Sequence, residues 1–415
     1  MVSIIAIPIV ILIIVLFLIT LRQLLNLNIE IWQIMLLGAI SVIALNEISF
    51  SSAIESIDMD VMLFLFSIFI IGKALEESGY LSHLSYSFLK NSRNAEDLLF
   101  FLILLAGFGS AILMNDTLAI IGTPLVLHLA EKHNLPKKMM LLALAFSITI
   151  GSVMSPIGNP QNLLIATKAN LPNPFITFLY YLFIPTLLNL FILFFLLKYF
   201  YGSNIKYKRI DHYKEPIRDS SLAVLSFLSL VLLFILIIIY TLSFIFHFQF
   251  LSLSQISFIS AAILMVFSNK RFEIIKGIDW GTLVFFASMF ILMQAVWDTG
   301  TIQEELQYVS LDLSFIPVII FTGIVVSQLI SNVPFVALYL PILLSNSFSE
   351  SSLMALAAGS TIAGNFMILG AASNVIIIQN AEKRGATLTA KDFLKVGVPL
   401  TLFNALIYSI YLMIV

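Results

Sequence analysis

Four clusters of small polar residues interrupt long apolar stretches of this chain, and chemistry could occur at these places. The clusters are Met114-Asn115-Asp116-Thr117, Ser155 to Asn162, Ser331-Asn332-Val333-Pro334 and Gly364 to Asn374. Asn, Gln, Ser and Thr side chains can bind an ion or a substrate oxygen, while Pro and Gly interrupt helical hydrogen bonding. Inside a bilayer, such breaks persist only where they are buried in protein or line a cavity. The clusters therefore predict a binding site.

Asp116 is the one carboxylate that lies deep within these apolar stretches. A carboxylate in a membrane is costly and usually functional, and its two leading roles are proton relay and coordination of a cation such as Na⁺. Capping of a helix is the structural alternative. Lys73, Asp60 and Lys168 lie near the ends of apolar stretches, and we interpret them as snorkelling residues.

The composition indicates a membrane protein. Of the 415 residues, 60% are apolar and 11% are charged, whereas soluble domains have about 25% charged residues. A net charge of -2 leaves nucleic acid no basic face to bind, and the absence of Cys excludes disulfides and cysteine nucleophiles. No pair of the five His has the spacing of metal ligands on a helix. Because no predicted span contains paired catalytic carboxylates, a His cluster or an activated nucleophile, we expect no enzyme and no cofactor beyond a coupling Na⁺ or H⁺.

Long apolar segments recur along the whole chain at the length that a spanning helix needs. We predict ten spans, near 3–21, 30–47, 59–76, 139–168, 173–199, 220–245, 251–268, 280–297, 350–379 and 392–414. Two of them, 139–168 and 350–379, are broken helices. The stretches 98–130 and 313–346 are each interrupted midway, which favours re-entrant hairpins.

Residues in the two halves match at nearly constant offsets. Ile57-Asp58 matches Ile278-Asp279 at 221, Asn115 and Pro124 match Asn332 and Pro341 at 217, and Thr149, Gly158 and Asn162 match Thr361, Gly370 and Asn374 at 212. The pattern predicts a duplication, with a first repeat at 1–200, a cytoplasmic linker at 201–219 and a second repeat at 220–415. Asp116 matches Val333, so the duplicated architecture does not require its charge.

The basic residues predict the orientation. With five spans and one hairpin in each half, all of the 21 Lys and Arg except Lys168 fall on one side, which is then cytoplasmic. Both termini are expected to be extracytoplasmic, in the plasma membrane. An odd number of spans in each half makes the repeats inverted, as in secondary transporters. The predicted fold is an all-α polytopic membrane protein with two inverted repeats of five transmembrane helices, each with a re-entrant hairpin and a broken helix.

At these motifs the chain resembles the ion transporter superfamily of arsenite permeases (ArsB), NhaD-type sodium/proton antiporters and divalent-anion/sodium symporters. The resemblance rests on Ala74 to Gly79, Asn115-Asp116-Thr117, Gly158-Asn159-Pro160-Gln161-Asn162, Ser331-Asn332-Val333-Pro334 and Gly370 to Asn374. It implies a scaffold and a mobile transport domain, with substrate and coupling ion at the hairpin tips and broken helices. The symporters carry Ser-Asn-Thr at both tips, whereas this chain has Asn-Asp-Thr and Ser-Asn-Val-Pro. The Asn-Asp tip and the later Thr123-Pro124 resemble the arsenite permeases.

We therefore predict a secondary active transporter of an inorganic anion or oxyacid, with arsenite or antimonite efflux driven by H⁺ or a cation gradient. The alternatives are an NhaD-type Na⁺/H⁺ antiporter and a passive anion channel, although a channel needs a continuous polar pore lining. A homodimer and a separate ATPase subunit are the protein partners that we consider. The predicted binding residues are Asn115, Asp116, Thr117, Gly158, Asn159, Gln161, Asn162, Ser331, Asn332, Asn365, Gly370, Ser373 and Asn374, with Na⁺ at Asn115, Asp116 and Asn162.

Overall fold

The structure is a computed structural model, and it describes residues 6–25, 29–80, 83, 92–169, 171, 173–204, 217–246, 251–301, 312–345 and 349–415. These residues form helices and contain no β-strand, so the all-α prediction is confirmed. Most of the predicted linker 201–219, including His212, lies outside the described residues.

The helices of the first half follow the predicted spans closely. They are α1 (Ile7–Leu25), α2 (Ile31–Ala44), α3 (Phe50–Ser56), α4 (Met59–Ser78), α6 (Ala95–Leu113), α7 (Asn115–Lys132), α8 (Lys137–Ser152), α9 (Pro160–Lys168), α10 (Pro174–Tyr201) and η1 (Gly202–Asn204). The predicted broken helix 139–168 corresponds to α8 and α9, which are separated by the polar segment at Ser155 to Asn159.

The second half has the same order of elements. They are α11 (Ser220–Ile245), α12 (Leu253–Phe267), α13 (Arg271–Gly277), α14 (Trp280–Asp298), α16 (Ile316–Ile330), α17 (Asn332–Ser345), α18 (Glu350–Phe366), η2 (Ile368–Gly370), α19 (Ala372–Glu382) and α20 (Ala390–Ile414). The predicted hairpin 313–346 corresponds to α16 and α17, and the broken helix 350–379 to α18 and α19.

Five helices among the described residues are long and apolar enough to cross a membrane: α6, α10, α14, α20 and residues 220–243 of α11. The 19 residues of α6 make it about as long as the bilayer core is thick. Each arm of a re-entrant hairpin enters the bilayer only partway, so such an arm is expected to be shorter than α6. The re-entrant path of this segment therefore stays a prediction.

The two halves share local geometry at the offsets read from the sequence. Asp58 caps α4 by accepting a hydrogen bond from the backbone N–H of Val61, and Asp279 caps α14 by accepting one from Thr282. The seven-residue helices α3 and α13, which directly precede these caps, are also equivalent. Sequence reasoning did not predict them, because they are too short to give a spanning signal.

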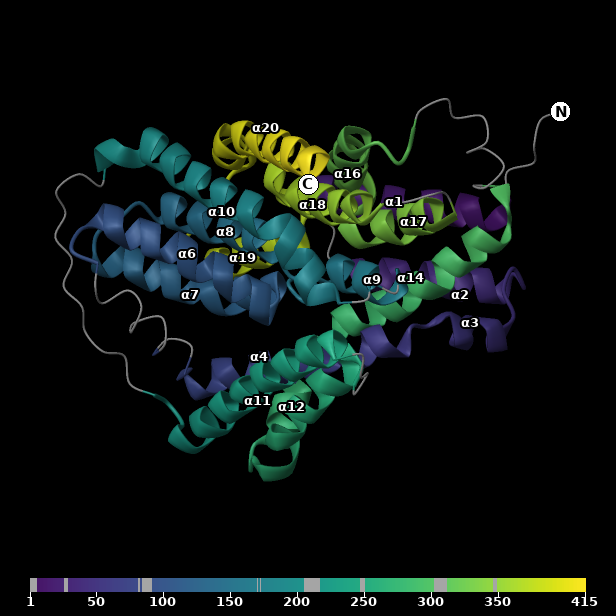
Figure 1. Cartoon of the computed structure of the whole chain (residues 1–415), viewed down its shortest axis with the longest axis horizontal. Helices are drawn as coiled ribbons and strands as arrows, with labels where there is room; N and C mark the ends of the chain where they lie inside the picture. Colours follow the sequence, from purple (N-terminus) through teal and green to yellow (C-terminus); the bar gives the residue numbers. More distant parts are fainter. Residues whose placement is uncertain are drawn as a thin grey trace.

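The halves interlock in space (Figure 1). Helix α4 packs against α11 and α12, whereas its counterpart α14 packs against α1 and α2. The remaining helices form one group in which α6 contacts α8, α16 contacts α18, and α8, α10, α18 and α20 pack together. Each half therefore contributes one helix that packs on the first two helices of the other half. The groups of helices that pack together in space thus differ from the two halves of the sequence.

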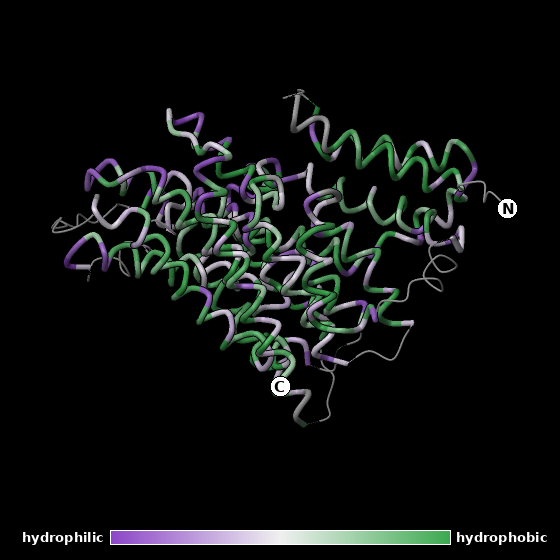
Figure 2. The backbone as a smooth tube through the Cα atoms, turned by 90° about the horizontal axis from the view of Figure 1, so that it is seen from above, coloured by the Kyte–Doolittle hydropathy of each residue, from purple (hydrophilic) through white to green (hydrophobic). Residues whose placement is uncertain are grey.

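Apolar side chains cover the outside of the molecule. Phe17, Phe195, Ile238 and Leu402 are exposed on α1, α10, α11 and α20, and Figure 2 shows hydrophobic colouring along most helices. A water-soluble monomer rarely exposes such continuous apolar area. The surface therefore fits a lipid environment, as the multi-pass prediction requires.

Candidate functional site

Asn162 and Asn374 support the two helix breaks in the same way. The Asn162 side-chain amide donates to the carbonyls of Ser152, Val153 and Ser155 at 3.0 to 3.2 Å. The Asn374 amide donates to the carbonyl of Gly364 at 2.6 Å, again ten residues earlier in the chain. Because the last carbonyls of a helix lack intrahelical donors, these bonds satisfy the backbone where α8 and α18 end.

Two equivalent glycines let the chain turn tightly at the breaks. A Cβ at Gly158 would lie 2.2 Å from the carbonyl oxygen of Ser152, and one at Gly370 would lie 2.5 Å from that of Ala363. Only a residue without a side chain fits against backbone this closely. Gly158 and Gly370 therefore shape the breaks.

The first break also contacts a hairpin tip and the second half. The backbone N–H of Asn115 donates to the carbonyl of Gly158 at 2.9 Å. The side-chain amides of Asn159 and Gln161 both donate to the hydroxyl of Thr361 on α18, at 3.1 and 3.2 Å. The first hairpin tip, the first broken helix and the second broken helix thus form one connected polar region.

Both hairpin tips bend at a residue with unusual backbone geometry. Met114 has φ 66° and ψ 146°, and Ser331 has φ 71° and ψ 160°. A non-glycine residue with positive φ is strained by about 1–3 kcal/mol, and such strain clusters at functional sites. The next residues, Asn115 and Asn332, begin α7 and α17 and are buried.

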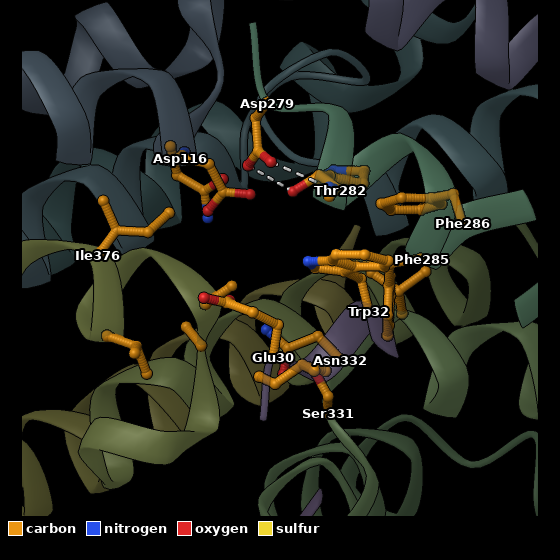
Figure 3. A pocket seen from close by; sticks show the side chains of 18 of the residues that line it. Glu30, Trp32, Asp116, Asp279, Thr282, Phe285, Phe286, Ser331, Asn332 and Ile376 are labelled. Carbon is orange, nitrogen blue, oxygen red and sulfur yellow. Dashed lines mark hydrogen bonds between the residues drawn. The ribbon is translucent and has the colours of Figure 1, made fainter. Parts of the chain in front are cut away.

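The polar tips meet at a cavity of about 470 Å³ (Figure 3). Its walls come from both hairpin tips, from α9, α14 and α19, and from the start of α2 together with Glu30 before it. Five of the predicted binding residues line it, namely Asn115, Asp116, Gln161, Ser331 and Asn332.

The other predicted binding residues do not line this cavity. Thr117 lines a smaller cavity next to it. The remaining ones support the breaks or are buried nearby: Gly158, Asn159, Asn162, Asn365, Gly370, Ser373 and Asn374. Neither amide atom of Asn365 has a hydrogen-bond partner, and the same is true of the hydroxyl of Ser373.

The charged side chains that line the cavity are all acidic: Glu30, Asp116 and Asp279. Asp279 accepts hydrogen bonds from the backbone N–H of Thr282 at 3.0 Å and from its hydroxyl at 2.6 Å. Figure 3 shows Asp116 and Asp279 on one side of the cavity and Glu30, Ser331 and Asn332 on the other. Within the described part of the chain, the lining of the cavity therefore offers many oxygen acceptors and no basic side chain.

Sequence reasoning missed Glu30, Trp32, Asp279 and Trp280 as lining residues. The repeat identifies Asp279 as the equivalent of Asp58. A carboxylate directly before a predicted span is, however, also typical of an ordinary helix cap. Only the close approach of α14 to the first hairpin tip reveals that it faces Asp116.

Two further cavities are equivalent by the repeat but differ in chemistry. One of about 170 Å³ is lined by Phe69, Lys73, Glu76, Asp116, Ile120, Ile121 and Asp279, among others. The other, of about 460 Å³, is lined at the matching positions by Phe290, Gln294, Trp297, Ala337 and Leu338. Among the described residues, Lys168 is the one charged residue that lines this second cavity, whereas carboxylates line only the cavity that adjoins the site. There, Lys73 forms ion pairs with Glu76 at 3.0 Å and Glu77 at 2.9 Å.

Comparisons with known proteins indicate a transporter. The profile of the family described as CitMHS, Citrate transporter, matches residues 14–351. The uncharacterized transporter Rv2684 of Mycobacterium tuberculosis is 26% identical over 405 residues, which cover 92% of each chain. The P protein of Mus musculus is 32% identical over 183 residues, which cover 40% of this chain and 22% of that protein.

One solved structure shares the fold. The crystal structure of the YdaH transporter of Alcanivorax borkumensis superposes with a TM-score of 0.54 at 14% sequence identity, and it covers 85% of this chain and 84% of that chain. At this identity the likeness concerns the fold alone.

Proposed function

The chain belongs to the CitMHS citrate transporter family, and on that premise we propose that it is a secondary active transporter of a small inorganic oxyacid, with arsenite or antimonite efflux as its activity. Transport is coupled to H⁺ or to a cation gradient. The transporter assignment agrees with the motif resemblance to the arsenite permease and NhaD superfamily, which the family match confirms.

The observation that carries the proposal is the charge of the cavity. The charged residues among the described ones that line it are Glu30, Asp116 and Asp279, with no Lys, Arg or His. Carboxylates repel an anion in a confined space of low dielectric constant. Arsenite is mostly the neutral acid near neutral pH, so the carboxylates do not repel it. Its hydroxyl groups can donate hydrogen bonds to the carboxylate oxygens and to the side-chain oxygens of Asn115, Ser331 and Asn332.

Citrate, which the family description names, fits this cavity less well in its free form. Three substrate carboxylates would face three protein carboxylates, and no basic side chain that lines the cavity would pair with them. We therefore rank free citrate, phosphate and sulfate below a neutral oxyacid as substrates.

Sodium/proton antiport is the second candidate, because Asp116 and Asp279 line the same two cavities. Lys73, the basic residue among the described ones that line these cavities, pairs with Glu76 and Glu77 instead. In that case cations would be the only cargo. A passive anion channel is disfavoured, since an acidic cavity would exclude anions rather than conduct them.

Transport by purified protein in lipid vesicles tests the proposal. We expect arsenite flux that saturates with concentration and accumulates arsenite against its gradient when a pH or Na⁺ gradient is imposed. Phosphate, sulfate and citrate should give little flux. Transport of these anions without arsenite transport would contradict the proposed substrate, and Na⁺/H⁺ exchange without any oxyacid flux would favour the antiporter.

We also propose a plasma-membrane location with both termini extracytoplasmic, and assembly as a homodimer. A separate ATPase subunit is not needed for gradient-driven transport. Flux from the single purified chain would support that view.

A further inference from the structure

The cavity of about 460 Å³ lies apart from the central cavity. Among the described residues, none lines both of them. Its walls come from α9, α14 and α17, together with Ser56 at the end of α3. Helix α17 packs against α9 and α14, and α14 packs against α3 (Figure 1). The proposed binding of an oxyacid at the hairpin tips therefore does not account for this second cavity.

The lining of this cavity is mainly apolar. Of the thirteen described residues that line it, nine are apolar, among them Phe290, Met293, Trp297 and Leu338. Sites for small organic molecules have volumes of about 300–1,000 Å³, and they are lined mainly by apolar and aromatic side chains with a few polar groups that fix orientation. Both the volume and the lining of this cavity match such a site. Its shape of chemistry thus fits a ligand with an apolar body.

The polar part of the lining carries one charge. Its members among the described residues are Ser56, Lys168, Gln294 and Ser345, and Lys168 is the charged one. The ammonium of Lys168 pairs at 2.7 Å with Asp58, which does not line the cavity, and the Lys168 side chain is 49% exposed. Because an ammonium has three N–H donors, this pair leaves donors for a second acceptor. Lys168 can therefore also bind an anionic head group.

The equivalent cavity of the other repeat has the opposite character. It measures about 170 Å³, and Ile120 lines it at the position equivalent to Ala337. It is also lined by three carboxylates, those of Glu76, Asp116 and Asp279, which would repel an anion. No carboxylate is among the described residues that line the larger cavity. The fold thus does not require a large, mainly apolar cavity with a basic residue at this place.

We infer that the larger cavity binds a single-chain amphiphile with an anionic head group, of the class of medium-chain carboxylic acids. The carboxylate binds at Lys168, and the chain lies against Phe290, Met293 and Leu338. The volume is in the range of sites for drug-sized molecules, which favours one chain over a bilayer lipid with two. Binding requires neither an oxyacid nor an ion gradient, so the inference is independent of the proposed function.

The chain contains a reporter for this cavity. Trp297 lines it, whereas the other two of the three Trp, Trp32 and Trp280, line the central cavity. Replacing these two by Phe leaves Trp297 as the only tryptophan. In phosphatidylcholine vesicles, ω-bromoundecanoic acid should quench its fluorescence in a saturable way, because bromine quenches a nearby indole. The neutral ω-bromoundecanol should bind about three- to fivefold more weakly, which is the scale of a partly exposed charge pair.

Three variants in this single-tryptophan background test the site. Ala337→Ile introduces the side chain of the equivalent Ile120, and we expect it to lower the affinity for the acid about tenfold or more without lowering the unfolding temperature, because it fills empty space. Lys168→Gln should lower the affinity to that of the alcohol. Lys198→Gln is the matched control, since Lys198 is 42% exposed, pairs with Glu96 at 2.6 Å and does not line the cavity. It should bind the acid with the parent affinity.

Four results would overturn the inference. They are quenching that rises only in proportion to the probe, parent affinity in folded Ala337→Ile, an equal loss in Lys168→Gln and Lys198→Gln, and displacement of the acid when phosphatidylglycerol is mixed into the vesicles. The last result would identify an anionic bilayer lipid as the occupant. If Ala337→Ile does not fold, the two Lys variants and the alcohol still decide whether the acid binds at Lys168.

Discussion

The side-chain amides of Asn162 and Asn374 show how one residue type serves two purposes in this protein. Both lie in predicted binding motifs, yet their amide groups donate to backbone carbonyls at the ends of α8 and α18. Asn332 lies at a hairpin tip instead and lines the cavity. The Oδ1 atoms of all three residues lack a hydrogen-bond partner within the described part of the chain, so the position of Asn332 in the cavity wall is what distinguishes it. Sequence alone does not separate these roles, because both require an amide in an interrupted apolar stretch.

This difference predicts opposite phenotypes for two Asn→Ala variants. Asn374→Ala should lower the free energy of unfolding by about 1–3 kcal/mol, because the buried carbonyl of Gly364 loses its donor. Asn332→Ala should leave stability near the parent value and lower transport. Thermal unfolding of the purified variants, together with flux at equal protein amount, measures both. If Asn374→Ala is fully stable and only transport is lost, Asn374 is a ligand rather than a support.

At the scale of elements, the sequence located the interruptions well but not the short helices. The breaks at Ser155 to Asn159 and around Met367 were predicted, since polar residues, Gly and Pro stand out in apolar segments. Helices α3 and α13 were not, because seven residues give no periodic signal. The cap at Asp279 was visible in the sequence, but its cavity-facing position depends on how α14 packs.

The contact between α6 and α8 depends on glycine. A Cβ at Gly151 would lie 2.0 Å from the backbone oxygen of Gly107, so no side chain fits between these helices. Because a neighbouring backbone cannot yield as a flexible side chain can, we expect Gly151→Ala to cost about 3 kcal/mol or more, at the upper end of overpacking effects.

Gly202→Ala is the control for this prediction. It follows α10, and its Cβ would meet nothing closer than Lys198 Cγ at 3.7 Å. The yield of monodisperse protein and its unfolding temperature should fall for Gly151→Ala and stay unchanged for Gly202→Ala. Equal behaviour of the two variants would show that α6 and α8 can separate freely.

At the scale of the whole molecule, the sequence predicted two equivalent halves but not their interlocking. Helix α4 packs on α11 and α12, and α14 packs on α1 and α2. Offsets between matching residues reveal duplication, whereas contacts between the halves arise from side-chain packing over long sequence separations. The division into 1–200 and 220–415 therefore describes the chain, and the spatial groups combine parts of both halves.

The inverted arrangement predicts opposite exposure of equivalent positions. Ser51 on α3 and Phe272 on α13 are related by the offset of 221, and both are exposed. The chain has no Cys, so single replacements can be labelled without background. We expect Ser51→Cys to react with an impermeant thiol reagent in intact cells, and Phe272→Cys to react only in inside-out vesicles. Labelling of both from the same side would rule out inverted repeats.

We propose that this chain couples the movement of a neutral oxyacid to an ion gradient through Asp116. The carboxylate lines the cavity and caps no helix in the described residues, so loss of its charge should affect coupling rather than folding. The most direct measurement is arsenite accumulation in vesicles that contain the parent or Asp116→Asn, with an imposed pH or Na⁺ gradient. We predict gradient-driven accumulation by the parent, and only passive exchange by Asp116→Asn. Accumulation by Asp116→Asn with the same gradient dependence as the parent would show that Asp116 does not couple transport to the gradient.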